Sequence, residues 1–372
     1  MGGVRVRGLI LMKASSFLPL CEKLESLAQR LPEALRQPIL GEITPIKRLF
    51  VLQRPPRLVI LGERAAHKAQ LLNALFGSEV LPPAEESLHD GAWQPLRIDG
   101  RGSLEVLDAR RPVSLPAAQA ALATRPADLI LVLRGAEQID GEFAADLDHA
   151  AQLMETAAIR ENPALRVLGL QCSGDDAARE QLHGALHTVL AIEQRMIGTL
   201  SWGAGLEETA RLVEVLGGEL PPESQLELAR LSGNRVLQAQ IARVLLKSTT
   251  AIAGAIGAQP IPMADFPVLT ALQGALVAGI MHISARPMSA RLAGEFIGAL
   301  GANLGFAMAL REGARAGVKL LPVWGNAISG AVAAAGTYGV GRAAIAFFIE
   351  GVSLEEARKF FTLRRKFPFL GG

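Results

Sequence analysis

Cysteine is scarce in this chain, and so is net charge. Only two cysteines occur among the 372 residues, Cys21 and Cys172, and their wide separation matches no metal-binding spacing. We therefore expect no disulfide framework, which is typical of proteins in a reducing compartment. The 38 basic and 36 acidic residues leave a net charge of +2, so no global field favours nucleic acid as a partner.

The beginning of the sequence lacks a long apolar run. The apolar stretch at 8–12 stops at Lys13 and is too short for a secretory signal. We expect a protein that stays on the cytoplasmic side of the inner (plasma) membrane. Apolar residues make up 50% of the chain and the 38 glycines add about 10%, against a usual ~45–50% for the combined class. The excess must be buried or face lipid.

Three regions differ in their sequence pattern. Residues 1–52 contain amphipathic pieces broken by prolines, which predict a helical extension ending near the linker-like QRPPR. Residues 53–217 alternate short apolar runs with helix-period segments, the pattern of a mostly parallel sheet covered by helices. Residues 223–372 show no strand alternation and predict an all-α, charge-poor helical domain. The glycines and prolines of GGELPPES at 217–224 predict the boundary between these two domains.

The middle region is expected to contain six strands and five helices. The dipeptide Asp99-Gly100 separates the second and third strands and is a hairpin signal. The predicted strands are 57–61, 95–98, 104–107, 128–133, 166–171 and 196–201. The predicted helices are 68–76, 115–124, 142–158, 176–190 and 205–216.

The sequence LVILGERAAHKAQLLNALFG at 58–77 is close to a phosphate-binding loop. An intact loop has the pattern G-x-x-x-x-G-K-[ST], in which the Lys reaches phosphate and the hydroxyl ligates Mg²⁺. This chain keeps Gly62 and Lys68, but His67 replaces the second Gly and Ala69 replaces the hydroxyl residue. The expected site is therefore a damaged one.

Four further segments follow this loop. They are LEVLDARRP at 104–112, ADLILVLRG at 127–135, RVLGLQCSGDD at 166–176 and GTLSWGAGLEET at 198–209. Their order and spacing resemble the Era-like GTPases of the TrmE-Era class. The resemblance implies an α/β three-layer P-loop GTPase-like domain that binds GTP or GDP weakly if at all. It also implies a vestigial nucleotide site made of Gly62, Lys68, Asp108, Asp175 and Ser201.

The departures from the family pattern extend beyond the loop. Arg111 replaces the Gly of the switch, and no Thr lies between Val80 and Ile98 to act as the first switch. Cys172 and Ser173 replace the Asn and Lys of the guanine-binding N-K-x-D, and Trp202 replaces the Ala after Ser201. Because phosphoryl transfer depends on metal electrostatics and positioning, these changes predict a pseudo-GTPase without catalytic residues.

A plain structural interpretation of the same residues stays open. In it Lys68 is a solvated helix residue, Asp108 and Asp175 are strand-end turn residues, and Arg110 and Arg111 are exposed loop charges rather than anion ligands. The remaining histidines are scattered and predict no metal site.

Charge is scarce near the end of the chain. Residues 248–349 contain nine charged side chains in 102 positions, and the charge-free windows 266–285 and 320–341 reach the ~20 residues needed to cross a hydrocarbon core. The pairs Gly294/Gly298 and Gly301/Gly305 have the GxxxG spacing that lets helices approach closely in lipid. The alternative is a helical bundle packed through Ala and Gly.

The C-terminal region resembles the uncharacterised helical domain commonly found behind Era-like GTPases. The resemblance rests on AQPIPMADFPVLTALQ at 258–273 and AAAGTYGVGRA at 333–343, and it implies a peripheral or integral membrane link. We therefore expect a non-catalytic, membrane-associated scaffold or regulator that pairs with itself or with an intact GTPase. The alternatives are a weakly active GTP-binding protein, a cytoplasmic location, and a transport or channel role for the helical domain.

Overall fold

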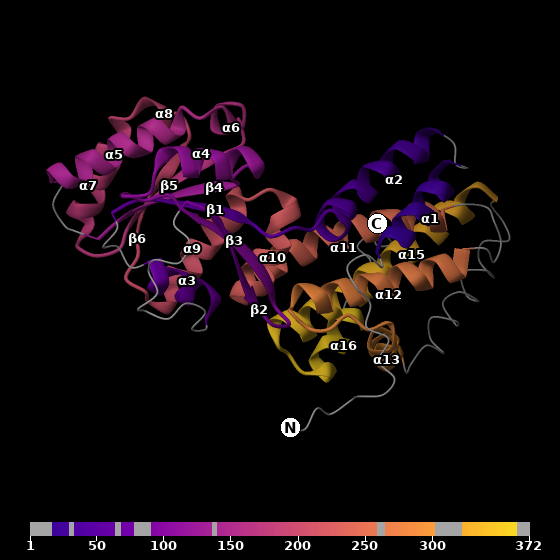
Figure 1. Cartoon of the computed structure of the whole chain (residues 1–372). Coiled ribbons are helices and arrows are strands. Elements are labelled where there is room, and N and C mark those ends of the chain that lie inside the picture. The colour runs from indigo at the N-terminus through magenta and orange to yellow at the C-terminus, as the bar shows by residue number, and fades with distance from the viewer. Residues whose placement is uncertain are drawn as a thin grey trace, which may run out of the picture. The chain divides into compact units, whose positions relative to one another are not determined.

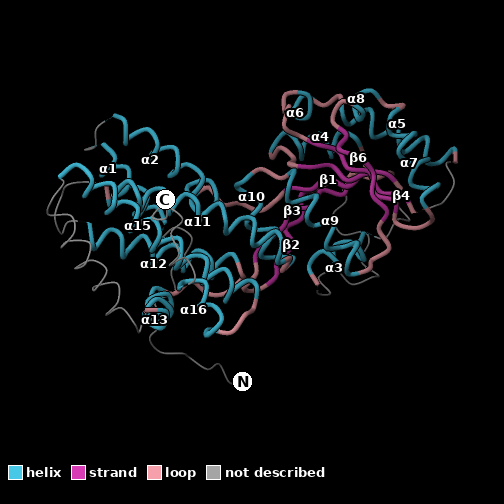
Figure 2. The backbone as a smooth tube through the Cα atoms, turned by 180° about the vertical axis from the view of Figure 1, so that it is seen from behind, coloured by secondary structure: helices cyan, strands magenta, loops and turns pink. Residues whose placement is uncertain are grey.

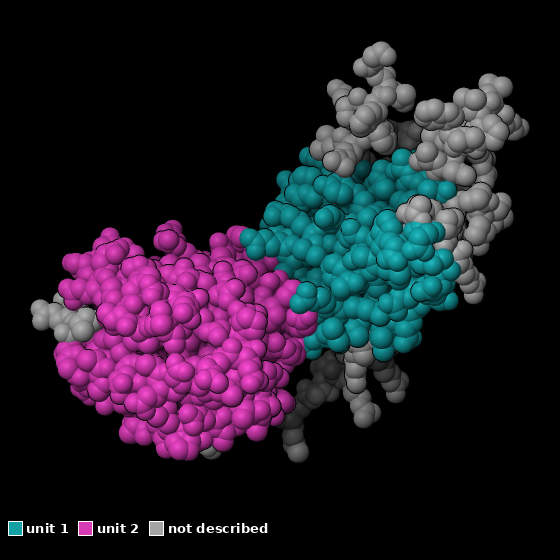
Figure 3. All heavy atoms as spheres, turned by 90° about the horizontal axis from the view of Figure 1, so that it is seen from above, with its two compact units in different colours: residues 1–53, 238–372 teal, residues 54–237 magenta. Residues whose placement is uncertain are grey.

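The computed structural model describes residues 17–29, 33–63, 68–77, 91–135, 140–258, 265–301 and 322–362. The chain divides into two compact units, coloured separately in Figure 3. Unit 1 comprises Met1–Gln53 and Gln238–Gly372, and unit 2 comprises Arg54–Leu237. The division after Leu237 lies later in the sequence than the boundary expected within 217–224, and the N-terminal extension belongs to the same unit as the C-terminal helices.

Unit 2 contains a mixed six-stranded sheet in the order β2-β3-β1-β4-β5-β6. All of its strand pairs are parallel except β2 with β3, which are antiparallel and joined by the predicted turn, where Arg101 N donates to Ile98 O at 3.0 Å. Pro95 lies in the edge strand, where a missing N–H is tolerated. The six expected strands are confirmed. They are β1 (Arg57–Gly62), β2 (Trp93–Ile98), β3 (Gly102–Asp108), β4 (Leu129–Arg134), β5 (Arg166–Gln171) and β6 (Met196–Ser201).

Helices cover both faces of this sheet, as Figures 1 and 2 show. The β4 sequence LILVLR is buried at every position, as expected of a central parallel strand covered on two sides. One face packs against α4 (Leu115–Thr124), α5 (Gly141–Met154), α6 (Ala157–Arg160), α7 (Asp176–His187) and α8 (Leu190–Glu193). The helices of the opposite side are α3 (Lys68–Phe76), α9 (Leu206–Glu219) and α10 (Pro222–Ser232).

The carboxyl ends of the five parallel strands meet at one edge of the sheet. The strand order reverses around β1, because the chain reaches β3 on one side of it before crossing to β4 on the other. Ligands of open α/β sheets bind at such a switch point, outside the carboxyl ends of the strands. The residues that follow β1, β3 and β4 therefore occupy the place where a ligand of such a sheet would bind.

Helix α10 lies beyond the expected boundary yet is part of unit 2. Its buried Glu227 accepts a hydrogen bond from Ser103 N at 3.1 Å, and a Cβ on Gly102 would lie 2.7 Å from Glu227 Cδ. The QRPPR sequence is also anchored. Arg54 donates two hydrogen bonds of 2.6 Å to Asp128. These bonds fix both ends of unit 2 to the sheet.

The described part of unit 1 is mainly helical, as expected, with short non-helical connections such as 284–289 and 351–353. The N-terminal helices pack into the same core as the C-terminal ones: the rings of Phe17 and Phe50 stack at 4.2 Å, and a Cβ on Gly279 would lie 3.1 Å from Phe17 Cζ. The helices are α1 (Phe17–Gln29), α2 (Glu33–Ile46), the π-helical η2 (Lys47–Val51), α11 (Arg235–Gly257, whose first three residues belong to unit 2), α12 (Asp265–Ile283), α13 (Ala290–Leu300), α15 (Pro322–Ile345), the π-helical η3 (Ala346–Glu350) and α16 (Leu354–Thr362).

One described helical stretch, Ser329–Glu350, is long and apolar enough to cross a membrane by length and composition. Half of its most apolar window is buried within the protein, and a core helix passes the same test. The other expected window corresponds to the shorter apolar helix Pro267–Ile283. Its residues from Leu276 to Ile283 are all buried. Both stretches therefore contribute to the core of unit 1.

Close helix approaches in the described part of unit 1 occur at glycines other than those with GxxxG spacing. Apart from their own helix backbone and chain neighbours, no described atom lies within 4 Å of a Cβ built on Gly294 or Gly298, whereas a Cβ on Gly257 would lie 2.6 Å from Ala333 Cβ. A Cβ on Gly330 would lie 2.7 Å from Gly254 O. Small residues thus bring α11 and α15 together. Gly305 lies outside the described residues.

Candidate functional site

Gly62 ends β1 in a conformation that only glycine adopts easily. Its φ is +91°, and a Cβ at this position would lie 2.2 Å from Leu133 O of β4. The next residue, Glu63, donates its backbone N–H to the same carbonyl at 2.8 Å. The lack of a side chain at Gly62 therefore allows the end of β1 to lie close to β4. The positions 64–67 that follow, including His67, lie outside the described residues.

Lys68 begins α3, and its side chain is buried. Its Nζ lies 2.6 Å from Oδ2 of Asp108, the last residue of β3, and the two side chains are only 3% and 2% exposed. The interpretation of Lys68 as a solvated helix residue is therefore wrong. Ala69 is also buried, with 5% exposed. The ammonium that would meet phosphate in an intact loop instead meets a carboxylate.

Arg110 completes a buried ion cluster with Lys68 and Asp108. Its Nε and Nη2 donate to the two oxygens of Asp108, each at 2.9 Å, and its Nη1 donates to Glu63 O at 3.1 Å. The Arg110 side chain is fully buried. The expectation of an exposed loop charge is wrong here, because the chain turns back after β3 and directs the guanidinium onto Asp108 and the backbone carbonyl of Glu63.

Opposing effects act on the carboxyl group of Asp108. Burial acts to raise its pKa, but the hydrogen bonds and charge of Arg110, together with those of Lys68, outweigh burial and lower the pKa below its usual value. Asp108 is therefore ionised at neutral pH. A buried ion pair of good geometry is costly to break, since removing one partner leaves a buried charge uncompensated at roughly 3–5 kcal/mol.

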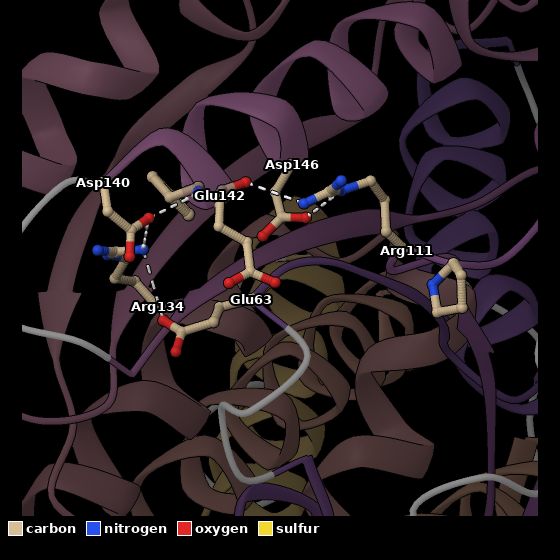
Figure 4. A pocket seen from close by; sticks show the side chains of 8 residues that line it. Glu63, Arg111, Arg134, Asp140, Glu142 and Asp146 are labelled. Carbon is tan, nitrogen blue, oxygen red and sulfur yellow. Dashed lines mark hydrogen bonds and ion pairs between the residues drawn. The ribbon is translucent and has the colours of Figure 1, made fainter.

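A pocket of about 290 Å³ adjoins this cluster (Figure 4). It lies between the residues that follow β1, β3 and β4 and the first turns of α5. Arg134 is buried between two acids, with Nη1 3.6 Å from Glu63 Oε2 and 3.9 Å from Asp140 Oδ1. Its guanidinium also lies 4.2 Å from the ring centroid of Phe143, a cation–π contact. The lining residues are Glu63, Arg111, Pro112, Arg134, Asp140, Glu142, Phe143 and Asp146.

The charges of this pocket bind one another and the nearby backbone. Arg111 Nε donates to Asp146 Oδ1 at 2.6 Å, and this hydrogen bond raises the pKa of Arg111. Asp140 caps α5 by accepting from Phe143 N at 2.8 Å, the main reason that the pKa of Asp140 is lowered. Glu63 Oε2 accepts from Gly135 N at 2.8 Å. The arrangement ties together the ends of β1, β3 and β4.

The two remaining predicted site residues lie apart from the cluster. Asp175 is the N-cap of α7 and accepts from Ala178 N at 3.0 Å. Ser201 ends β6 and is exposed. Among the described residues, neither forms a hydrogen bond or ion pair with Lys68 or Asp108. The structure thus brings together Gly62, Lys68 and Asp108, while Asp175 has the turn role of the plain interpretation.

The neighbouring Trp202 is buried, and Cys172 is half-buried. Trp202 is 2% exposed and donates from Nε1 to Thr209 Oγ1 at 3.2 Å. Burial raises the pKa of the Cys172 thiol to about 12. Both positions differ from the family pattern, and the Trp202 side chain belongs to the interior of unit 2.

No family model matches the chain, and no curated protein matches it. Among the described residues, no group of three His, Cys, Asp or Glu side chains could hold a metal ion. The residues at the end of β1 and β3 do not fit a Mg²⁺-nucleotide: Ala69 has no hydroxyl, and both oxygens of Asp108 accept hydrogen bonds from protein cations. We therefore derive no hydrolytic step at this site.

Sequence reasoning missed the acids and arginine that surround the cluster, namely Glu63, Arg134 and Asp146. Each is a charged residue beside an apolar segment, and such residues usually face solvent. The only local signal is the spacing Asp108-x-Arg110, which lets a guanidinium fold back onto the preceding carboxylate. Arg111 and Asp146 are 35 positions apart in the sequence, and Glu63 and Gly135 are 72 apart.

Proposed function

We propose that unit 2 is a degenerate Era-like G domain that does not hydrolyse GTP, and that the chain acts as a membrane-associated scaffold or regulator. In this proposal the α/β unit provides a pre-formed surface, which pairs with a second copy or with an intact GTPase. The helical unit supplies the membrane link.

The observation that carries the proposal is the ion cluster of Lys68, Asp108 and Arg110. In the resemblance, Lys68 is the phosphate-binding residue and Asp108 the switch residue next to the metal. Here the two bind each other at 2.6 Å, and Arg110 binds both oxygens of the same carboxylate. A buried site whose charges are already paired supports a structural role for both residues.

The topology supports the same assignment at the level of fold. The five parallel strands carry the resembling segments at their carboxyl ends, and the damaged loop follows β1, where the strand order reverses. Intact nucleotide sites of α/β proteins occupy this place. A G domain that lost its catalytic residues and kept its fold accounts for two observations. The segments keep the order and spacing of the family, and the residues within them are altered.

A turnover assay on the full chain tests the proposal. We expect GTP hydrolysis by the wild type to equal that of Lys68→Ala, because Lys68 takes no part in phosphoryl transfer. Lys23→Ala provides a matched control that removes an exposed lysine of α1 and leaves the cluster intact. Turnover that is present in the wild type and lost in Lys68→Ala would overturn the non-catalytic assignment.

The second candidate is a weakly active GTP-binding protein. It is favoured by the place of Lys68 at the first position of α3, since the N-terminus of a helix after a strand suits an anion. Under this alternative, nucleotide must break the bond between Lys68 and Asp108. Binding would then be accompanied by release of that ion pair, and Lys68→Ala would weaken it.

A further inference from the structure

A second, larger hollow lies in unit 1, along the groove between α11 and α15. Its volume is about 720 Å³. It does not involve the cluster of Lys68 and Asp108, which belongs to unit 2. The lining residues are Arg243, Leu246, Lys247, Thr250, Ala251, Gly254, Ala255, Ala334, Tyr338, Arg342 and Ile345.

The two helices run antiparallel along this groove. A Cβ on Gly341 would lie 2.5 Å from Leu246 Cδ1, and a Cβ on Gly254 would lie 3.3 Å from Ala334 Cβ. The early part of α11 therefore lies beside the late part of α15, and the late part of α11 lies beside earlier residues of α15. The stretch of α11 from Arg243 to Ala255 spans about 18 Å at 1.5 Å per residue.

The groove has two chemically different ends. One end carries the basic side chains of Arg243, Lys247 and Arg342 together with the apolar Leu246 and Ile345, and Tyr338 lines the groove nearer its middle. The other end is formed by small residues without polar side-chain atoms, namely Ala251, Gly254, Ala255 and Ala334. A ligand that fits along the whole groove needs a polar end and an apolar part.

The basic end has a surplus of positive charge. Arg342 is paired, since its guanidinium donates to both oxygens of Glu350 at 2.8 and 3.1 Å. Arg243 and Lys247 are exposed, and neither forms a hydrogen bond or ion pair with any described residue. Between the two ends, the Thr250 hydroxyl oxygen is buried and has no hydrogen-bond partner among the described residues. These groups favour an anion with hydrogen-bonding capacity.

We propose that this groove binds one anionic lipid, with its phosphate or carboxylate head at Arg243 and Lys247 and its acyl chain along the Ala and Gly end. Pockets that hold small molecules are mostly apolar, with a few polar groups that orient the ligand. A free phosphate ion would leave the apolar end unfilled, and a neutral lipid would leave the basic end without a partner. The inference extends the proposed membrane link to a defined site, and it does not require unit 2 to be a G domain.

Tyr338 is the only tyrosine of the chain, so it reports on the groove directly. Full-length protein labelled with 3-fluorotyrosine gives one ¹⁹F resonance. Lysophosphatidylglycerol, titrated as a monomer below its micelle concentration, should shift this resonance saturably. Lysophosphatidylcholine and glycerol phosphate, which lack the net charge and the chain respectively, should bind at least tenfold more weakly. No saturable shift, or equal binding of the three compounds, would overturn the proposal.

Two matched pairs of variants locate the ligand. Ala251→Phe adds a ring to an exposed position that lines the apolar end, and it should weaken lysophosphatidylglycerol binding at least tenfold. Its control is Val244→Phe on the same helix, an exposed position outside the groove, which should bind as the wild type does. Lys247→Gln should remove most of the preference for the anionic compound, whereas Lys23→Gln on α1 should keep it. If Ala251→Phe binds like the wild type, the groove is not the site.

Vesicles separate this inference from membrane association in general. Phosphatidylglycerol vesicles should cosediment the wild type and Val244→Phe, with Ala251→Phe retained less. If every variant cosediments equally and no monomeric lysolipid shifts the ¹⁹F resonance of Tyr338, membrane association stands and the groove proposal fails. If monomers bind and vesicles do not, the groove is a lipid site and the membrane part of the proposed function fails.

Discussion

Nζ of Lys68 lies 2.6 Å from Oδ2 of Asp108, and both side chains are almost completely buried. Lys68 begins the helix that follows β1, and Asp108 ends β3, so this bond joins the start of α3 to the end of β3. Arg110 binds the same carboxylate from another direction. One buried carboxylate thus binds two cationic side chains.

Asp108→Ala should therefore destabilise unit 2 more than any other change in the cluster. The substitution leaves two buried cations without their shared partner, and we expect a loss of about 3–5 kcal/mol in the free energy of unfolding. Lys68→Met should cost less, because Arg110 continues to neutralise Asp108. Asp175→Ala, which removes an exposed N-cap, should cost about 1 kcal/mol. Urea unfolding measures all three, and equal losses at Asp108 and Asp175 would contradict the ranking.

Stability should decrease in acid for the same reason. Since the pKa of Asp108 is lower in the folded protein than its unfolded value of about 3.9, its stabilising contribution is complete above that value. The contribution is lost as the pH falls through the folded pKa. The unfolding free energy of Asp108→Asn should accordingly depend less on pH below about pH 4 than that of the wild type. Parallel pH profiles for the two proteins would contradict this.

A substitution at Gly62 tests whether the backbone conformation of this residue serves the sheet or a ligand. Gly62→Ala places a Cβ 2.2 Å from Leu133 O at a φ of +91°, so we expect a loss of at least about 2 kcal/mol without any nucleotide present. Gly184→Ala is the matched control, because α7 is helical there and, apart from its own helix backbone and chain neighbours, no atom of the described chain lies within 4 Å of a Cβ at that position. That change should stabilise by about 0.5–1 kcal/mol. A harmless Gly62→Ala would refute the strand-contact role.

Much of unit 2 could be predicted from the sequence. Each predicted strand overlaps an observed one, because the strands of a doubly covered sheet are continuous apolar runs that end at turn residues. The Asp99-Gly100 turn and the helix at 68–76 were likewise readable from local pattern. The local sequence pattern does not identify the residue that a side chain contacts in the folded protein. Lys68 and Asp108 are 40 positions apart, and their contact depends on the register that pairs Ile60 with Asp108.

The grouping of helices was harder to predict than their existence. Helices α1 and α2 are amphipathic by pattern, but nothing in residues 17–46 indicates that Phe17 packs beside Gly279 of α12. The Pro and Gly residues at 217–224 mark the break between α9 and α10, which is a real turn. They do not mark the division into units, because α10 continues to pack on β3 through Glu227.

A truncation experiment distinguishes these boundaries. A fragment of residues 54–237 should unfold cooperatively, whereas 54–220 should be less stable by several kcal/mol, since it loses the buried Leu226 and Leu228 of α10. Glu227→Gln in the longer fragment should cost less than the truncation does, because it removes only the charge. If the two fragments unfold at the same urea concentration, the boundary lies within 217–224.

Thermal unfolding of the full chain with GTP, in the presence and absence of Mg²⁺, tests the central claim most directly. A ligand that binds the native state at 100 times its Kd stabilises it by about 2.7 kcal/mol, so productive Mg²⁺-nucleotide binding would raise Tm measurably. Because Asp108 is engaged by Lys68 and Arg110 and position 69 has no hydroxyl, we expect Mg²⁺ to add nothing to any shift caused by GTP alone. A Tm increase that requires Mg²⁺ and disappears in Lys68→Ala would contradict the account.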